Sequence, residues 1–373
     1  MRIALIHYWM QGWRGGEKVL QEIAKLYPTA DIFTHTYDRE LAEREFPGRR
    51  IFTTFIDRLP FAARYYQSYL PLMPLALEQL DLREYDLIIS NESGPAKGVV
   101  VGPHARHLCY CLSPMRYIWD MYHEYREGAG VLKRAAMAPL SHYLRMWDQL
   151  TAQRVDQFVA ISKFVADRIA RYYGRQSMVI HPPVAVEEFS LSRSSEEFYL
   201  SVGQLVRYKR ADLMVEAFND LGKPLVVIGE GELLRELRRI ARPNVQLLGW
   251  QPFEVIRDHY ERCRALVFPG VEDFGIVPVE AMACGKPVIA YGTGGALDTV
   301  VDGVTGMLFD RQDVATLGKA IRNFEEMGDV FDAGKIREHA MGFSTARFVE
   351  EFSGLVADLV GASPSLPSSQ CGR

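Results

Sequence analysis

The chain has 373 residues, of which 48% are hydrophobic and 24% are charged, and it carries a formal net charge of −4. This length exceeds one typical domain and predicts two lobes of comparable size, while the ordinary globular composition excludes a low-complexity chain. The sequence has no apolar run long enough to span a bilayer, and its slightly acidic balance gives no reason to expect a nucleic-acid partner.

The amino-terminal residues do not resemble a signal peptide. Arg2 leads directly into an apolar segment, residues 3–6, that is too short for the hydrophobic region of such a peptide. The five cysteines are odd in number and lack metal-ligand spacing, which fits a reducing compartment. Cys109 and Cys111 fall on a predicted strand, where alternation points both side chains to one face, so we expect them in the core. These features predict a cytoplasmic protein.

Apolar runs in the first half of the chain predict strands of a buried parallel sheet. They lie at residues 2–9, 31–37, 51–55, 86–91, 107–111, 157–161 and 178–181, with helices predicted at residues 17–26, 131–152 and 163–173. The loop after the first strand carries Gly12, Gly15 and Gly16, a spacing that differs from the G-x-G-x-x-G dinucleotide fingerprint and therefore disfavours a dehydrogenase. Each of these glycines also fits a tight strand-to-helix turn.

Residues 59–80 are rich in aromatic residues and leucines and contain Pro60, Pro71 and Pro74. Because proline lacks a backbone N–H donor, one continuous helix is excluded, and we predict two short helices joined by a bend.

Two prolines, Pro182 and Pro183, follow the last strand of the first half and predict a stiff connector. Beyond them, a β-α rhythm at close spacing predicts a doubly wound sheet. Its strands are expected at residues 198–202, 225–228, 245–248, 265–268, 287–290 and 307–309, with helices between them. Residues 311–361 are predicted to be helical. Residues 362–373, rich in serine and proline, are predicted to form a disordered tail.

The segment that carries most of the chemistry follows the strand at residues 265–268. A loop with Glu272 comes next, and a helix is predicted to begin at about Pro278, because proline suits the first position of a helix. The free backbone N–H groups at such a helix start attract anions. Glu280 falls in the predicted first turn, where by itself it would complement the helix dipole. A nucleotide sugar, which has both phosphates and hydroxyls, would use the N–H groups and the carboxylates together.

The spacing of the two carboxylates is the more specific signal. Glu272 and Glu280 are separated by seven residues, and residues 281–290 together with Gly294 and Gly295 complete the pattern. This region resembles the E-x7-E signature of retaining glycosyltransferases with the GT-B fold, specifically glycosyltransferase family 4. The resemblance covers nearly the whole chain and is strongest at residues 198–310.

The resemblance implies an α/β architecture, the GT-B fold, in which two Rossmann-like lobes with doubly wound parallel sheets face each other across a cleft. Residues 1–182 would form an acceptor-binding lobe and residues 183–345 a nucleotide-sugar-binding lobe. Residues 346–361 would form a helix that crosses back to the first lobe, ahead of the predicted tail at residues 362–373.

The resemblance also implies a donor site with catalytic residues. Glu272 would face the transferred sugar, and Glu280 would bind the ribose hydroxyls. Arg207 and Lys209 would neutralise the leaving diphosphate, with Arg207 supplying the charge of an arginine that family members usually carry where Gln204 stands. The residues further expected to bind the donor are Gly15, Gly16, Gly203, Gln204, Gly249, Phe274, Gly275 and Ile276.

Residues 113–120 follow a predicted strand at the end where open α/β sheets bind ligands. This segment resembles a motif of a mannosyltransferase-like branch of family 4 that a histidine often precedes. Leu112 stands near that place, so no catalytic histidine is assigned. Arg116 and Tyr117 are the predicted acceptor-binding residues, with Arg116 holding an anionic group. Alternatively, Arg116 pairs with Asp120, four residues on in a helix.

The first half of the chain is net basic and the second half net acidic. The basic surplus includes Arg49, Arg50, Arg58 and Arg64, which lie in or near the aromatic segment at residues 59–80. Two interpretations stay open for this region: a surface that lies on an anionic membrane, or a packed helical pair with solvated arginines.

We therefore predict a retaining hexosyltransferase, cytoplasmic or peripheral on the inner membrane face. It would need no cofactor besides its nucleotide-sugar substrate, with GDP-mannose as the candidate donor and a glycan or lipid-linked acceptor in polysaccharide biosynthesis. No metal is expected, since Asp310 and Asp313 are badly spaced for a D-x-D pair, and basic groups would take its place. Two alternatives stay open: an epimerase of the same fold, and a non-catalytic nucleotide-sugar-binding protein, against which the pair Glu272 and Glu280 argues.

Overall fold

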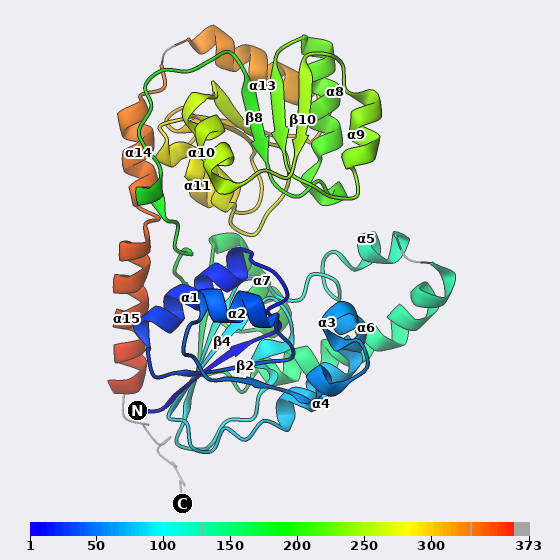
Figure 1. Cartoon of the computed structure of the whole chain (residues 1–373), viewed down its shortest axis with the longest axis vertical. Coiled ribbons are helices and arrows are strands. Elements are labelled where there is room, and N and C mark those ends of the chain that lie inside the picture. Colours follow the sequence, from blue (N-terminus) through cyan, green and yellow to red (C-terminus); the bar gives the residue numbers. More distant parts are fainter. Residues whose placement is uncertain (129, 329, 362–373) are drawn as a thin grey trace, which may run out of the picture. The chain divides into compact units, whose positions relative to one another are not determined.

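The computed structural model describes residues 1–128, 130–328 and 330–361, so the predicted tail at residues 362–373 lies outside the described residues. The chain forms two compact units (Figure 1). The first lobe consists of Met1–Ala160, Val165–Ile180 and the described residues from Val349 on, and the second lobe of Ile161–Phe164 and His181–Phe348.

The first lobe is built on a seven-stranded parallel sheet with the strand order β3-β2-β1-β4-β5-β6-β7. Its strands are β1 Ile3–His7, β2 Asp31–Thr34, β3 Ile51–Thr53, β4 Leu87–Glu92, β5 Arg106–Cys111, β6 Gln157–Ala160 and β7 Ser177–Val179. From β1 the first three strands run in order toward one edge of the sheet, which β3 forms. The strands from β4 to β7 then run in order toward the other edge. The order therefore reverses between β1 and β4, which is the switch point where open α/β sheets form a crevice at the carboxyl ends of their strands.

The helices of the first lobe follow the expected alternation with the strands. They are α1 Gly15–Leu26, α2 Arg39–Glu45, α5 Tyr122–Glu127, α6 Val131–Ala152 and α7 Lys163–Tyr173, with a 3₁₀ turn, η3, at Pro95–Gly98. Leu144 and Trp147 of α6 pack with Ile6 and Ile88 of the sheet in one buried cluster. The predicted bounds of α6 and α7 agree with the structure.

Residues 59–80 contain the two short α-helices that were predicted, but a 3₁₀ helix rather than a bend joins them. The structure has η1 Phe55–Arg58, α3 Ala62–Tyr65, η2 Tyr66–Leu72 and α4 Met73–Glu78 in close succession. Pro71 lies inside η2 and Pro74 in the first turn of α4. Proline breaks the α-helical hydrogen-bond ladder, but a 3₁₀ turn and the start of a helix both accommodate it, so the segment continues as short helical pieces.

The second lobe has a six-stranded parallel sheet with the order β10-β9-β8-β11-β12-β13. Its strands are β8 Tyr199–Val202, β9 Leu225–Ile228, β10 Val245–Gly249, β11 Ala265–Phe268, β12 Val288–Tyr291 and β13 Gly306–Phe309. Its helices are η4 Val186–Glu188, η5 Arg207–Lys209, α8 Ala211–Leu221, α9 Leu234–Ile240, α10 Phe253–Arg262, α11 Ile276–Ala283, α12 Ala296–Thr299, α13 Val314–Met327 and α14 Ala333–Met341. The last helix, α15 Thr345–Gly361, begins in the second lobe, and its residues from Val349 on belong to the first.

The core of the second lobe explains why the continuous apolar runs form central strands. Phe218 of α8 and Ile321 of α13 pack with Tyr199 and Val267 of the sheet in one fully buried cluster. Burial of each such side chain contributes about 1.5–3 kcal/mol, so a strand without alternation is stable only between two helical layers. The cysteines among the described residues, Cys109, Cys111, Cys263 and Cys284, are buried and free, in agreement with the predicted core position of the first two.

Candidate functional site

The loops after β8, β9 and β10 are linked through their backbones at the carboxyl edge of the second sheet. The N–H of Gly203 donates to Ile228 O at 3.0 Å, and the N–H of Gly229 donates to Gly249 O at 2.8 Å. A Cβ added at Gly229 would lie 1.8 Å from Gly203 O, and both glycines have φ near +145°. Gly229 is required because a side chain would separate two loops whose backbones are in contact, and at Gly203 the positive φ disfavours any other residue.

Lys209 ends η5 in the loop after β8 and contacts the loop after β11. Its backbone packs against Gly270, where an added Cβ would lie 2.8 Å from the Lys209 Cα, and its Nζ lies 3.4 Å from the position of a Cβ at Gly203. The next residue, Arg210, has φ of +55°, a left-handed conformation that costs a non-glycine residue on the order of 1 kcal/mol. The strain is tolerated in the turn that directs Lys209 toward the loop after β11.

The structure brings together two predicted catalytic residues that are far apart in the sequence. Lys209 Nζ lies 2.7 Å from Glu272 Oε1, and the two side chains are only 20% and 23% exposed. The third predicted catalytic residue, Arg207, is exposed on the same turn, as is Gln204. In this structure Glu272, the carboxylate predicted to face the sugar, therefore pairs with Lys209, the cation predicted to neutralise the leaving diphosphate.

The helix after β11 begins earlier than predicted. Helix α11 starts at Ile276, and Gly275 precedes it with φ of +87°, so Pro278 is the third helical residue and Glu280 lies beyond the first turn. The two predictions about Pro278 and Glu280 were wrong, because the left-handed turn at Gly275 already begins the helix. Phe274, Gly275 and Ile276, the predicted N–H donors, lie at this start.

Glu280 is held by a buried tyrosine. The hydroxyl of Tyr260 in α10 donates to Glu280 Oε2 at 2.8 Å. Burial, together with the nearby carboxylate, raises the pKa of Tyr260 far above its ordinary value, so the hydroxyl stays a donor. Glu280 lies outside the first turn, so it interacts only weakly with the helix dipole. The bond from Tyr260 instead fixes the orientation of its carboxylate as an acceptor.

Gly294 and Gly295, which belonged to the recognised pattern, support the β11–α11 loop from behind. The N–H of Gly295 donates to Glu272 O at 2.8 Å. A Cβ at Gly295 would lie 2.3 Å from the Phe274 Cα, and one at Gly294 would lie 2.6 Å from Glu272 O. This contact was not predicted, although the glycine pair itself was the sequence signal for it.

In the first lobe, Gly15 and Gly16 begin α1 at the switch point. A Cβ at Gly16 would lie 2.6 Å from the Tyr8 hydroxyl and 3.0 Å from Leu112 Cδ1, so a side chain at this position would have to displace the ends of both neighbours. The carbonyl oxygen of Gly16 accepts from Asn91 Nδ2 at 2.7 Å.

Sequence reasoning missed a buried group beside these glycines. Asn91 Nδ2 lies 3.3 Å from His7 Nδ1, and His7 Nε2 lies 3.8 Å from Glu17 Oε1. An amide N–H facing Nδ1 assigns the ring proton to Nε2, on the side of Glu17. The contact could have been predicted from the strand order, because His7 and Asn91 are paired neighbours at the ends of the adjacent strands β1 and β4.

The predicted acceptor segment, residues 113–120, forms turns rather than a helix. The helix assumed in the alternative pairing of Arg116 was therefore wrong, and Asp120 pairs with Arg168 of α7. Arg168 also donates to Ser113 Oγ at 3.0 Å. Tyr117, the second predicted acceptor residue, has a buried hydroxyl.

A fully buried charge cluster lies beneath this segment, and the sequence did not predict it. Lys97 pairs with Glu92 at 2.9 Å and also with Asp148, and all three side chains are inaccessible. Trp119 Nε1 donates to Asp148 Oδ2 at 2.7 Å, which attaches the segment to the cluster. Burial raises the pKa of Glu92 to about 7, and the two carboxylates raise the pKa of Lys97 in spite of its burial.

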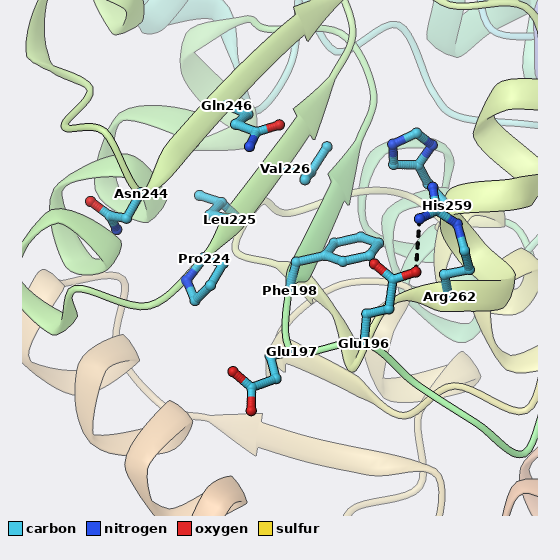
Figure 2. Close-up of a pocket in the computed structure, with 10 residues that line it drawn as sticks. All are labelled: Glu196, Glu197, Phe198, Pro224, Leu225, Val226, Asn244, Gln246, His259 and Arg262. Carbon is cyan, nitrogen blue, oxygen red and sulfur yellow. Dashed lines mark hydrogen bonds and ion pairs between the residues drawn. The ribbon is translucent and has the colours of Figure 1, made fainter.

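A hollow of about 400 Å³ lies at the opposite edge of the second sheet (Figure 2). Its lining comes from the amino-terminal ends of β8, β9 and β10 and from α10: Glu196, Glu197, Phe198, Pro224, Leu225, Val226, Asn244, Gln246, His259 and Arg262. Arg262 pairs with Glu196 across it at 2.9 Å. This hollow does not coincide with the predicted donor residues, which follow the carboxyl ends of the strands.

Asp313, one of the two badly spaced aspartates, has a structural role, because it accepts from Thr316 N at 2.7 Å at the start of α13. Within residues 1–128, 130–328 and 330–361, no three His, Cys, Asp or Glu side chains gather so that they could hold a metal ion. In the same part of the chain, none of the helices combines the length and the apolar character that crossing a membrane requires.

Two parallel α/β lobes with these carboxyl-edge loops define the GT-B architecture. The crystal structure of HepE of Anabaena in complex with UDP has this fold, with a TM-score of 0.72, 20% identity, and coverage of 96% of this chain and 100% of that one. A family model described as glycosyl transferases group 1 matches residues 163–340, and one described as glycosyltransferase family 4 matches residues 13–188. The chain belongs to glycosyltransferase family 4.

Curated relatives agree with this family. An uncharacterized glycosyltransferase of Methanocaldococcus jannaschii is 30% identical over 171 residues, which are 44% of this chain and 48% of that protein. The GDP-mannose-dependent alpha-(1-6)-phosphatidylinositol monomannoside mannosyltransferase of Mycolicibacterium smegmatis is 28% identical over 198 residues, 44% of this chain and 52% of that protein. The chain thus spans about half the length of the curated relatives it matches.

Proposed function

We propose that the protein is a retaining hexosyltransferase that moves a hexose, with mannose from GDP-mannose as the candidate, to a glycan or lipid-linked acceptor in polysaccharide biosynthesis. The observation that carries the proposal is the contact between Lys209 and Glu272 beside the start of α11. A cation and the N–H groups at a helix start suit the diphosphate of a nucleotide sugar, and a carboxylate suits its sugar hydroxyls.

The chemistry of the reaction assigns a role to each group. As the glycosidic bond breaks, negative charge grows on the diphosphate, and donors arranged in advance stabilise that charge most strongly. Lys209, Arg207 and the N–H groups from Phe274 to Ile276 would supply this stabilisation, so that no metal ion is needed. Glu272 would accept hydrogen bonds from the sugar. The diphosphate that Lys209 and Arg207 would bind gains charge only in the transition state. Loss of either cation should therefore lower kcat more than it raises KM.

The nucleoside part of the donor would bind along the same edge. Glu280, oriented by Tyr260, would accept the ribose hydroxyls. The backbone at Gly249 would line the base, and Gly203 and Gln204 would lie beside the diphosphate. Gly15 and Gly16 of the first lobe would approach the phosphates, and Arg116 and Tyr117 the acceptor. In this proposal the first lobe binds the acceptor and the second lobe binds the donor.

The proposal is tested by binding and turnover. A thermal-shift screen with GDP-mannose, UDP-glucose and an ADP-sugar should raise the melting temperature for one base, because a ligand of the folded state stabilises it. Glu272→Ala should then abolish release of nucleoside diphosphate from that sugar. An epimerised free sugar without transfer would identify an epimerase instead. Binding with neither transfer nor hydrolysis would identify a non-catalytic binding protein.

We also propose that the first lobe lies on an anionic membrane surface. Phe61 is 75% exposed at the start of α3, where its φ is +54°, and Leu75 and Tyr65 are about half exposed nearby. Arg58 and Arg64 are exposed beside them. Basic and apolar side chains on one short helical segment favour the interface of an anionic bilayer.

Two of the four arginines first considered have hydrogen-bond or ion-pair partners within the lobe. Arg49 donates to the carbonyls at the end of α1, at 2.8 Å for Tyr27 O, and Arg50 pairs with Asp31 at 2.7 Å. The membrane proposal therefore rests on Arg58 and Arg64.

Sedimentation with liposomes tests this surface. Binding to anionic vesicles should fall as salt rises, since exposed charges are screened beyond about 8 Å at physiological ionic strength. Arg58→Glu with Arg64→Glu should reduce binding. A charge-matched control, Arg83→Glu with Arg311→Glu, changes two arginines whose side chains are 86% and 75% exposed and should bind normally. Equal recovery in the supernatant with anionic and neutral vesicles at low salt would leave a freely diffusing glycan as the acceptor.

A further inference from the structure

The β11–α11 loop, residues 269–275, is held in place by groups from three other parts of the second lobe. Glu272 O accepts from Gly295 N at 2.8 Å, and Asp273 O accepts from Ser162 Oγ at 2.5 Å. The ring of Phe274 stacks on His181, with 5.4 Å between centroids. Three consecutive residues of this loop are thus fixed, and two of them carry groups with proposed functions: the Glu272 side chain and the Phe274 N–H.

Ser162 comes from an unexpected place in the chain. It lies between β6 and α7 of the first lobe, yet residues Ile161–Phe164 belong to the second lobe. Its side chain is fully buried, and 111 positions separate it from Asp273 in the sequence.

The same short segment is attached to the second lobe at two further points. Ile161 O faces His181 Nδ1 at 2.9 Å, and the N–H of Lys163 donates to Asp298 Oδ2 at 3.1 Å. Asp298 is in α12, which directly follows Gly294 and Gly295. Residues 161–163 therefore form one wall behind the β11–α11 loop, and Gly295 with α12 forms the adjoining wall.

The bond from Ser162 has a geometric consequence for the proposed donor contacts. The carbonyl of Asp273 and the N–H of Phe274 belong to one planar peptide unit, in which they point in opposite directions. A hydroxyl that holds Asp273 O at the back of the loop thereby directs the Phe274 N–H out of its front. In the same way, Gly295 holds the Glu272 carbonyl and orients the peptide that follows Glu272.

We propose that Ser162 is a positioning residue for the donor: it fixes the Asp273–Phe274 peptide so that the Phe274 N–H faces the diphosphate and Glu272 keeps its place beside Lys209. This inference rests on the proposed function. The hydroxyl touches no substrate atom and acts through the loop. Through this hydrogen bond, a segment next to α7 positions a loop that lies 111 residues further along the chain.

The test is Ser162→Ala in the full-length protein, with GDP and UDP as binding probes and GDP-mannose and UDP-glucose as turnover probes. Loss of one hydrogen bond that orients a donor should weaken binding of the preferred diphosphate by about three- to tenfold. It should lower the rate of diphosphate release further, because the oriented N–H matters most when the leaving group gains charge. Ser162→Thr keeps the hydroxyl and should restore much of both.

A matched control separates positioning from stability. Thr305 is fully buried in the same lobe, and its Oγ1 accepts from Val301 N at 2.8 Å. It precedes β13 and so lies at the amino edge of the sheet, away from the β11–α11 loop. Thr305→Val should lower the melting temperature to a similar extent as Ser162→Ala and leave diphosphate binding and turnover unchanged.

A second variant weakens the attachment of residues 161–163 by changing Asp298, a half-buried residue. Asp298→Ala removes the bond to Lys163 N without opening a cavity in the core and should weaken diphosphate binding in the same direction by a smaller factor. Wild-type affinity and turnover in both Ser162→Ala and Asp298→Ala would overturn the proposal and leave Ser162 as an ordinary buried contact. The proposed function fails separately, if Glu272→Ala leaves binding and turnover of every nucleotide sugar unchanged.

Discussion

Because Glu272 forms an ion pair with Lys209, we predict that removing the Glu272 carboxylate increases the affinity for a nucleoside diphosphate. With no donor bound, Glu272 neutralises the cation that would hold the diphosphate, at 2.7 Å. A nucleoside diphosphate without sugar gains nothing from Glu272 and must take Lys209 away from it. Glu272→Gln should therefore bind GDP or UDP more tightly than the unmodified protein does.

The expected magnitude follows from the exposure of the pair. Side chains that are 20% and 23% exposed lie between solvated pairs, worth about 0.2–1 kcal/mol, and fully buried ones. Release of Lys209 and loss of one negative charge should together contribute about 0.5–1.5 kcal/mol, or roughly a two- to tenfold lower Kd. Turnover of the nucleotide sugar should change in the opposite direction, by about tenfold or more, since a hydrogen bond to a charged group is worth about 1.5–3 kcal/mol.

Isothermal titration calorimetry with GDP and UDP at neutral pH measures the first effect, and release of diphosphate measures the second. Glu196→Gln is the matched control, because it removes a carboxylate from an ion pair of 2.9 Å with Arg262 at the other edge of the same sheet. It should leave both quantities unchanged. A Glu272→Gln variant that binds the diphosphate no better than the unmodified protein does would refute the argument that this pair opposes donor binding.

Three further predictions follow from the contacts in both lobes. Glu280→Ala should weaken binding of the nucleoside diphosphate by about 1–3 kcal/mol in calorimetry, and unchanged affinity would exclude a ribose contact. Lys209→Ala and Arg207→Ala should lower kcat more than they raise KM, and activity that EDTA abolishes and Mg²⁺ restores would contradict a reaction driven by these cations alone. Burial raises the pKa of Glu92 to about 7, above its unfolded value, so its contribution to stability is present in acid and is lost as the pH rises toward 7. Glu92→Gln should reduce the loss of melting temperature between about pH 5 and pH 7, and a profile parallel to that of the unmodified protein would show that Glu92 does not take up this proton.

Local sequence was sufficient to predict the strands, because a strand buried between two helical layers needs a continuous apolar run, such as residues 265–268. It was also sufficient for the bounds of α6 and α7. Helix α11 was misplaced, since the prediction relied on Pro278, and the left-handed conformation of Gly275 is not visible in a sequence. The same limit explains residues 59–80, where the prolines exclude one long helix without determining that a 3₁₀ helix joins the two short α-helices.

The E-x7-E spacing identified the family and the carboxylates, because both belong to one contiguous segment. The partners of these carboxylates came only from the tertiary structure. Lys209 meets Glu272 because β8 and β11 are neighbours in the sheet, and Ser162 reaches Asp273 because the chain enters the second lobe briefly before α7. A sequence determines which residues begin and end a strand, but the order of strands decides which loops meet at its carboxyl edge, and that order depends on the packing of the whole lobe.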